Sequence, residues 1–169
     1  DAPAFNAKKI TDYKGDDGTE INSVQFTPDG NNILFARGNS KNNNGEPANP
    51  AFLQTSTASN IWIIGKDGNG LRKVTAGSYY KLSPDGKTLY FASEGHPGYG
   101  DLDLFVSKRL NDSWSSWSTP LNMGPIINSS AWDGYYTLSA RGDKAIIVSD
   151  NGANKLDLFE VFLPVAAQP

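Results

Sequence analysis

The stretch LSPDGKTLYFAS, which runs from Leu82 to Ser93, decides the fold of this chain of 169 residues. Pro84 presets the backbone of the first central position of a turn, Asp85 can cap that turn with a side-chain oxygen, and Gly86 can adopt positive φ. The apolar run Leu89–Ala92 then has the branched and aromatic content of a buried strand. The stretch is therefore predicted to be a tight turn that leads into an inner strand.

The same stretch occurs three times in the chain and aligns without a gap. The other copies are FTPDGNNILFAR, from Phe26 to Arg37, and LSARGDKAIIVS, from Leu138 to Ser149. Equivalent positions are 56 residues apart in both steps, as Thr27, Ser83 and Ser139 illustrate. The third copy keeps the glycine of the turn but has lost its Pro-Asp pair. A fixed period of this length indicates a repeat architecture.

Further strand signals predict four strands in each repeat. Short segments before the turn, such as Ser23–Phe26 and Tyr79–Leu82, make the first part of each unit a hairpin. An outer strand is predicted at Leu71–Thr75 in the first copy and at Trp114–Leu121 in the second. Between hairpin and outer strand, a polar residue, an aliphatic residue and an aromatic residue recur at Asn60–Ile64, Asp103–Ser107 and Asp157–Val161. Four short strands per repeat is the arrangement of a β-propeller blade.

The predicted fold is thus all-β: a β-propeller region over residues 1–169, built from about three four-stranded antiparallel blades. The blades should lie roughly at 20–76, 77–132 and 133–164, with a loop insertion at 39–59 that is rich in Asn, Pro and Ser. Closed propellers have about four to eight blades, and three blades would leave open edges. The ring is therefore expected to be partial, or to be completed by a second copy, by a partner chain or by missing segments.

Composition narrows the classes of function. The chain is 38% hydrophobic and 20% charged, with a net charge of −3 and no block of Lys or Arg. This composition fits a soluble globular protein and argues against nucleic acid as a partner, because phosphate binding needs a basic patch. The lack of cysteine excludes disulfides and thiolate zinc sites. The sequence contains no run of 18 apolar residues, so no transmembrane segment is predicted. The start at Asp1 without Met favours a processed chain.

The turn sequence also carries a family resemblance. Ser83–Phe91 resembles the TolB-type propeller repeat, whose hallmark is SPDGKxLxF, at every position. Trp117–Ser129 resembles the inter-blade segment of envelope proteins from Gram-negative bacteria of the Bacteroidetes type, in which propellers stand beside OmpA-like domains. The resemblance covers about residues 20–163. It implies a periplasmic, cell-surface or secreted protein of the Gram-negative envelope.

The residues that could carry a reaction are sparse. His96 is the only histidine and lies in the glycine-rich loop Glu94–Gly100, where we interpret it as a solvated loop residue rather than a general base. No Gly-x-Ser-x-Gly nucleophile elbow is present. The chain is therefore predicted not to be an enzyme.

Carboxylates are plentiful, and a glycosidase would need two of them at a set separation. Asp103 and Asp157 occupy the same repeat position, so we interpret them as turn caps. The segments Lys14–Gly18 and Lys66–Gly70 resemble calcium loops but lack the distal Glu of an EF-hand. We predict no cofactor, while calcium remains an open alternative at these loops. The acidic residues that could serve in either role are Asp16, Asp17, Glu20, Asp101, Asp103 and Asp157.

Aromatic residues near the blade junctions are the best candidates for binding. Such side chains can stack on sugars or anchor a protein partner, although packing between blades is the alternative role. Trp62, Phe105 and Phe159 share one repeat position and are predicted to be core. The candidate binding residues are Tyr79, Tyr80, His96, Tyr99, Trp114, Trp132 and Tyr135.

Three hypotheses of function follow. The leading one is a non-catalytic β-propeller module that mediates protein–protein interaction or scaffolding in a bacterial envelope or secreted complex. Its partners would be other protein chains, or a second copy that completes the propeller. The second hypothesis is a carbohydrate-binding or glycan-processing propeller, with a glycan as the partner. The third is a structural plug or spacer subunit of an outer-membrane complex.

Overall fold

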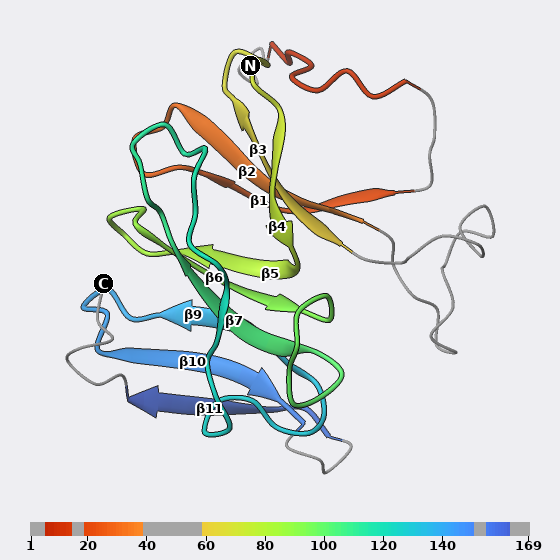
Figure 1. The fold of residues 1–169 in the computed structure, drawn as a ribbon. Coiled ribbons are helices and arrows are strands. Elements are labelled where there is room, and N and C mark those ends of the chain that lie inside the picture. The colour runs from red at the N-terminus through yellow and green to blue at the C-terminus, as the bar shows by residue number, and fades with distance from the viewer. Residues whose placement is uncertain (1–5, 15–18, 39–58, 151–154, 163–169) are drawn as a thin grey trace, which may run out of the picture.

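The computed structural model describes residues 6–14, 19–38, 59–150 and 155–162. All regular structure in these residues is β-strand, and it forms three antiparallel sheets. The sheets are stacked in chain order, with β1–β4 at one end and β9–β11 at the other (Figure 1). This arrangement confirms the predicted fold class, a partial β-propeller of three blades.

Each sheet is one blade, and its strands are hydrogen-bonded in chain order. Blade 1 contains β1 (Glu20–Phe26), β2 (Asn32–Gly38), β3 (Asn60–Gly65) and β4 (Arg72–Ala76). Blade 2 contains β5 (Ser78–Leu82), β6 (Thr88–Ser93), β7 (Asp103–Lys108) and β8 (Leu121–Asn122). Blade 3 contains β9 (Asp133–Leu138), β10 (Lys144–Ser149) and β11 (Asp157–Phe162).

Two elements differ from the sequence-based expectation. The outer strand predicted at Trp114–Leu121 is reduced to β8 and an isolated bridge between Arg109 and Trp117. Trp114 has a left-handed backbone conformation with a φ of 61°, and its side chain is buried, so the chain turns inward there instead of extending. Blade 3 has three strands within the described residues rather than four. Most of the predicted insertion, residues 39–58, lies outside the described residues.

The repeated turn is held by a hydroxyl and a carboxylate in all three copies. Ser83 Oγ accepts the N–H of Thr88 at 2.9 Å and donates to Asp85 Oδ1 at 2.6 Å. The third copy lacks the Asp of the turn, but Ser139 Oγ donates at 2.7 Å to Asp143, two positions further on. This hydrogen bond lowers the pKa of Asp143. The divergent copy thus forms the same turn with a carboxylate from another position.

A β-bulge recurs in the first strand of every blade. Ser23, Tyr79 and Tyr135 are spaced by the repeat period and have positive φ values of 52°, 47° and 49°. The strand register shifts at the same places in all three blades. A non-glycine residue in this conformation costs about 1–3 kcal/mol, so the surrounding structure must enforce it. The bulge is therefore a built-in feature of the repeat rather than a local irregularity.

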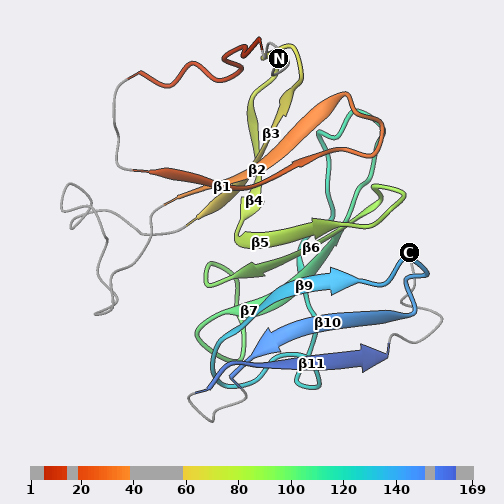
Figure 2. The same cartoon turned by 180° about the vertical axis from the view of Figure 1, so that it is seen from behind.

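Successive side chains of a strand point to opposite faces of the sheet. Because the inner strands are apolar at successive positions, both faces of a blade carry apolar side chains. We call the face toward the following blade the forward face and the face toward the preceding blade the backward face. One core cluster fills the junction of blades 1 and 2, and a second fills the junction of blades 2 and 3. A third, smaller cluster lies on the backward face of blade 1, where Ile10 packs on Ile33, Phe35 and Ile64. The described N-terminal segment 6–14 lies on the side of blade 1 turned away from blade 2 (Figure 2).

The turn glycines offer a matched pair of substitutions. Gly30 and Gly86 occupy the same repeat position with φ values of +67° and +69°. An added Cβ meets nothing within 4 Å at Gly30, but at Gly86 it would lie 2.8 Å from Trp114 and 3.2 Å from Pro28. We expect Gly30→Ala to lower the free energy of unfolding by about 1 kcal/mol through backbone strain alone. Gly86→Ala should cost about 2–4 kcal/mol, because overpacking adds to the strain. Urea denaturation of both variants measures the difference, and equal costs would contradict the packing of Trp114 against this turn.

Candidate functional site

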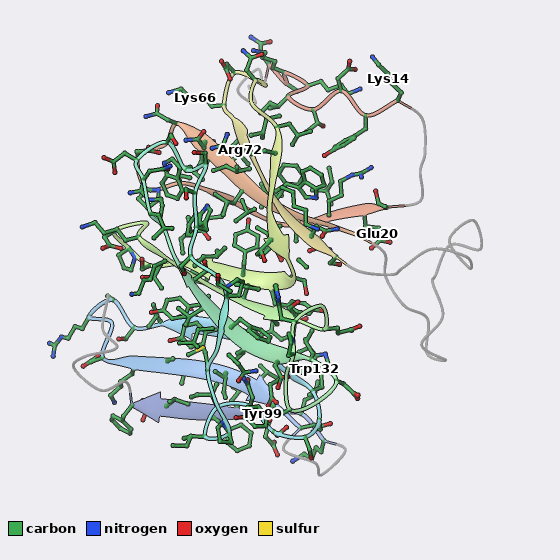
Figure 3. The ribbon with its side chains drawn as sticks, viewed as in Figure 1. Lys14, Glu20, Lys66, Arg72, Tyr99 and Trp132 are labelled. Carbon is green, nitrogen blue, oxygen red and sulfur yellow. The ribbon has the colours of Figure 1, made fainter. Side chains whose placement is uncertain are left out.

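Three of the seven predicted binding residues come together between blades 2 and 3. Tyr79 of β5 lies 4.4 Å from Tyr135 of β9 and 5.7 Å from Trp132, measured between ring centroids. Trp132, which is labelled in Figure 3, directly precedes β9 and lies 5.6 Å from Tyr135. Tyr135 is 51% exposed, while Tyr79 and Trp132 are half-buried. We call these three residues the aromatic trio.

The backbone fixes the trio in place. Tyr79 and Tyr135 are the bulge residues of their strands, so the left-handed conformation sets the direction of both side chains. A Cβ at Gly134 would lie 2.5 Å from the ring of Trp132, so that ring rests directly on the glycine backbone. Burial raises the pKa of Tyr79, and the neighbouring Tyr135 and Glu94 add to the shift. The trio therefore combines ring surface with phenol hydroxyls and a nearby carboxylate, a combination suited to stacking with hydrogen bonding.

Tyr80 and Trp114 lie in the core between blades 1 and 2 and not on the surface. The hydroxyl of Tyr80 donates to the carbonyl of Leu34 at 2.6 Å and also to the carbonyl of Ser23. The guanidinium of Arg109 covers the Trp114 ring at 4.3 Å from its centroid. Both residues thus join neighbouring blades, which is the alternative role considered for the junction aromatics.

His96 and Tyr99 belong to the loop that follows β6. The ring of His96 lies 5.2 Å from Phe105, and its Nε2 lies 3.2 Å from Thr75 Oγ1. Tyr99 exposes its ring to solvent, while its backbone N–H donates to Asp103 Oδ2 at 2.6 Å. The His96 ring contacts the rings of Phe91 and Phe105, at 5.9 and 5.2 Å between centroids, and these belong to blade 2 and not to the aromatic trio.

The carboxylates that share a repeat position have different roles. Asp103 is buried and accepts the N–H groups of Tyr99 and Gly100 at 2.6 and 3.4 Å, as expected of a turn cap. Asp157 is exposed and forms an ion pair with Lys155 at 3.1 Å. Glu20 and Asp101 are also exposed. Asp16 and Asp17 lie outside the described residues.

One of the two candidate calcium loops lies within the described residues. In Lys66–Gly70, Asp67 accepts the backbone N–H and the side-chain amide of Asn69 at 3.0 and 2.9 Å, so it holds its own turn. These hydrogen bonds lower the pKa of Asp67. Most of the other loop, residues 15–18, lies outside the described part of the chain. Across the described ranges, no group of three or more His, Asp or Glu side chains is placed to hold a metal ion.

The forward face of blade 3 is open to solvent. One repeat position near the start of the third strand is occupied by Ile61, Leu104 and Leu158 in the three blades. Ile61 and Leu104 are 0% exposed because the following blade covers them, whereas Leu158 is 74% exposed. Phe162, on the same strand, is exposed as well. Blade 3 thus presents the surface that blades 1 and 2 bury against a neighbour.

The backward face of blade 1 is open in its inner part. The position after the bulge is occupied by Val24, Tyr80 and Tyr136, of which Val24 is 66% exposed and the two tyrosines 7% and 3%. Phe26 pairs with Ile33 across the strands and is exposed on the same face. Ile10 covers only the outer part of this face. The two ends of the stack therefore expose the two halves of the interface that joins blades within the chain.

Two features of this site were not predicted from the sequence. The bulge residues Ser23, Tyr79 and Tyr135 do not share a residue type, and the only signal available was their common spacing of 56. Asp133 is fully buried, and its Oδ2 accepts the N–H and the hydroxyl of Ser129 at 2.6 and 3.0 Å. The repeat-equivalent residue of blade 2 is Gly77, so the period gave no reason to single out this acid.

Comparison with known proteins supports the fold and little more. No family model matches the chain, and no curated protein matches it. A puromycin-hydrolysing peptidase of Mycobacterium tuberculosis is a similar solved structure, with a TM-score of 0.55 and 20% identity over 86% of this chain and 22% of that chain. An oligogalacturonate lyase in complex with manganese has a TM-score of 0.46 and 14% identity over 89% of this chain and 37% of that chain. The chain thus spans well under half the length of these neighbours. Among the described residues, no helix is long and apolar enough to cross a membrane.

The prediction that the chain is not an enzyme has to be corrected. It rested on the propeller fold and on the scarcity of catalytic motifs in these residues. The similar solved structure with a TM-score of 0.55 is described as a peptidase. Since a region of this fold forms part of an enzyme there, the fold gives no reason to exclude catalysis.

The hydroxyl of Tyr80 provides a test of the blade junction. Tyr80→Phe leaves the ring in the core but removes the donor to the buried carbonyl of Leu34 and to the partly buried carbonyl of Ser23, which should lower the free energy of unfolding by about 1–3 kcal/mol. Tyr99→Phe, at an exposed ring, should change it by less than about 0.5 kcal/mol. Urea denaturation measures both variants. A Tyr80→Phe protein as stable as the wild type would contradict a bond between blades 1 and 2 at this position.

Proposed function

We propose that this chain is a protein-binding propeller module that assembles through the open faces of its terminal blades. The observation that carries the proposal is the exposure of Leu158, at a position that is fully buried in both other blades. A large apolar side chain at a recurrent packing position indicates a missing neighbour rather than an adapted surface. The neighbour that fits is another blade, since a blade fills this place twice within the chain.

The chain itself carries a matching surface. The forward face of blade 3 would receive a backward face of the kind that blade 1 exposes at Val24 and Phe26. Packing of this kind joins different surfaces of two copies, and it closes when the rotation per copy completes a ring. Two copies of three blades would give six blades, which is within the range of closed propellers. A second copy is therefore the partner that we propose.

The proposed setting is the Gram-negative envelope or a secreted complex. It rests on the resemblance of Ser83–Phe91 to the TolB-type repeat and of Trp117–Ser129 to the inter-blade segment of envelope proteins. In that setting the assembled blades would act as an interaction platform or as a spacer between envelope components. No step of the assembly argument depends on this location.

Solution mass tests the assembly. Sedimentation equilibrium of the wild-type chain should give a concentration-dependent mass that approaches twice 18.2 kDa. Leu158→Asp and Val24→Asp, both at exposed positions, should each weaken association at least about tenfold without changing thermal unfolding. An equimolar mixture of the two variants should regain part of the association, because a mixed pair contains one unaltered interface. A mass of 18.2 kDa at all concentrations, or variants that associate like the wild type, would refute the proposal.

Glycan binding is the second candidate function, and the aromatic trio favours it. Tyr135 exposes its ring beside Tyr79 and Trp132, the arrangement on which a sugar ring can stack. If the trio binds a neutral oligosaccharide, Tyr135→Ala should abolish glycan-array signals that Tyr99→Ala retains. An array without any signal for the wild-type chain would exclude this role for the glycans displayed.

A further inference from the structure

The outer strand of blades 1 and 2 pairs with the third strand at the same repeat position. In blade 1, Trp62 and Ile63 of β3 pair with Lys73 and Arg72 of β4. In blade 2, the equivalent residues of β7 are Phe105 and Val106, which pair with Asn122 and Leu121 of β8. Two independent copies therefore show which part of the third strand receives an outer strand.

In blade 3 this position has no paired strand among the described residues. The equivalent residues of β11 are Phe159 and Glu160. Within the described ranges, β11 pairs with β10 on one side and with no strand on the other. β11 is the last strand at the blade 3 end of the stack in both views (Figure 1 and Figure 2). Its outer edge offers backbone N–H and C=O groups of the kind that bind an added strand.

A pocket of about 410 Å³ lies directly beside this edge. Its walls include Phe159, Glu160 and Val161 from β11, Ile147 from β10, and the segment 125–129 that connects blades 2 and 3. Ile126 in this segment is 92% exposed. A pocket with apolar side chains among its walls suits a bound strand at this edge, since the edge supplies affinity through backbone hydrogen bonds and the pocket accepts a side chain of the added strand.

We propose that the edge of β11 and this pocket form a strand-addition site for an extended segment of another protein chain. The segment would pair antiparallel with β11 at Phe159 and Glu160 and place an apolar side chain in the pocket. The pocket shares Phe162 with the forward face of blade 3, but Leu158, on which the proposed assembly depends, does not line it, so a change at Leu158 can distinguish the two proposals.

The chemistry of the occupant follows from blade 1. Ile63, the repeat equivalent of Glu160, lies opposite Arg72 in the β3–β4 pair. A basic residue at that position of an added strand would lie opposite the carboxylate of Glu160, which also forms a half-exposed ion pair with Lys144 at 3.1 Å. Opposite charges in directly paired positions stabilise a sheet. The site therefore fits an extended segment that combines a basic residue with apolar ones, as β4 itself does.

A peptide copy of β4 is the probe. A fluorescein-labelled peptide with the sequence of residues 71–77, LRKVTAG, is titrated with the whole chain and followed by fluorescence anisotropy. We expect saturable binding, and the Lys73→Pro peptide should not bind, because Lys73 is a paired position of the β3–β4 ladder and proline there disrupts the paired strand. No binding of the LRKVTAG peptide at protein concentrations up to about 1 mM would overturn the proposal.

Surface variants locate the binding. Ile126→Asp should weaken peptide binding at least about tenfold, and it should leave folding intact because the side chain is almost fully exposed. Leu110→Asp, at another exposed leucine, is the matched control and should bind like the wild type. Equal binding by the Ile126→Asp chain, or by the proline peptide, would show that strand addition at this edge is wrong. Binding that begins only after removal of residues 163–169 would assign the edge to this chain's own following residues and overturn an intermolecular role.

Leu158→Asp separates the two proposals. This variant should lose self-association and still bind the peptide, because Leu158 lies on the forward face and does not line the pocket. Loss of both activities in a folded variant would place the peptide on the forward face and overturn the strand-addition site.

Discussion

The packing of one blade against the next is the interaction on which the rest of this structure depends. A four-stranded sheet with apolar residues on both faces cannot bury them alone, so each face needs a neighbouring sheet. Blade 2 has a neighbour on either side, and its strand β6 is buried along its whole length. Burial of apolar surface at about 25 cal/mol per Å² makes these two junctions the main source of stability. The terminal blades have one junction each, which leaves one face of each without a blade.

The recurrent bulge serves the same packing. Its left-handed residue shifts the strand register, and the next side chain then reaches the preceding blade, as the Tyr80 hydroxyl does at the Leu34 carbonyl. The strain at Tyr79 is offset by that junction, so backbone conformation and packing between blades are coupled. In blade 1 the same bulge directs Val24 to a face without a neighbouring blade, where the side chain is exposed. The inner strand of blade 1 thus has the shape that packs against a neighbouring blade elsewhere in the stack, with no blade on that face among the described residues.

The sequence predicted what depends on local chemistry and on the period. The turn around Gly86 and the buried strand that follows it could be predicted, because glycine favours positive φ in turns and a short apolar run favours a buried strand. The outer strand of blade 2 was predicted too long, since burial of Trp114 overrides the extended tendency of its neighbours. The sequence predicted the members of the aromatic trio as binding candidates. It did not predict that they touch, because their contact depends on a bulge that has no characteristic residue type. The sequence predicted that the ring is incomplete, but it did not show which faces are uncovered. Those faces were located by comparing the exposure of equivalent side chains in the three blades.

The two ends of the stack are not alike, and this difference bears on how the chain assembles. At blade 1, Ile10 covers the outer part of the backward face and Arg37 stacks on the Tyr13 ring at 3.9 Å, so the N-terminal segment partly replaces a neighbour. At blade 3, the forward face and the edge of β11 are both open within the described residues. Each contact of the proposed assembly joins blade 3 of one copy to blade 1 of the other, so the blade that docks on the forward face of blade 3 brings this N-terminal segment with it. The segment must then be accommodated or displaced in every interface, because Ile10 already packs on Ile33, Phe35 and Ile64 of the face that is to be covered.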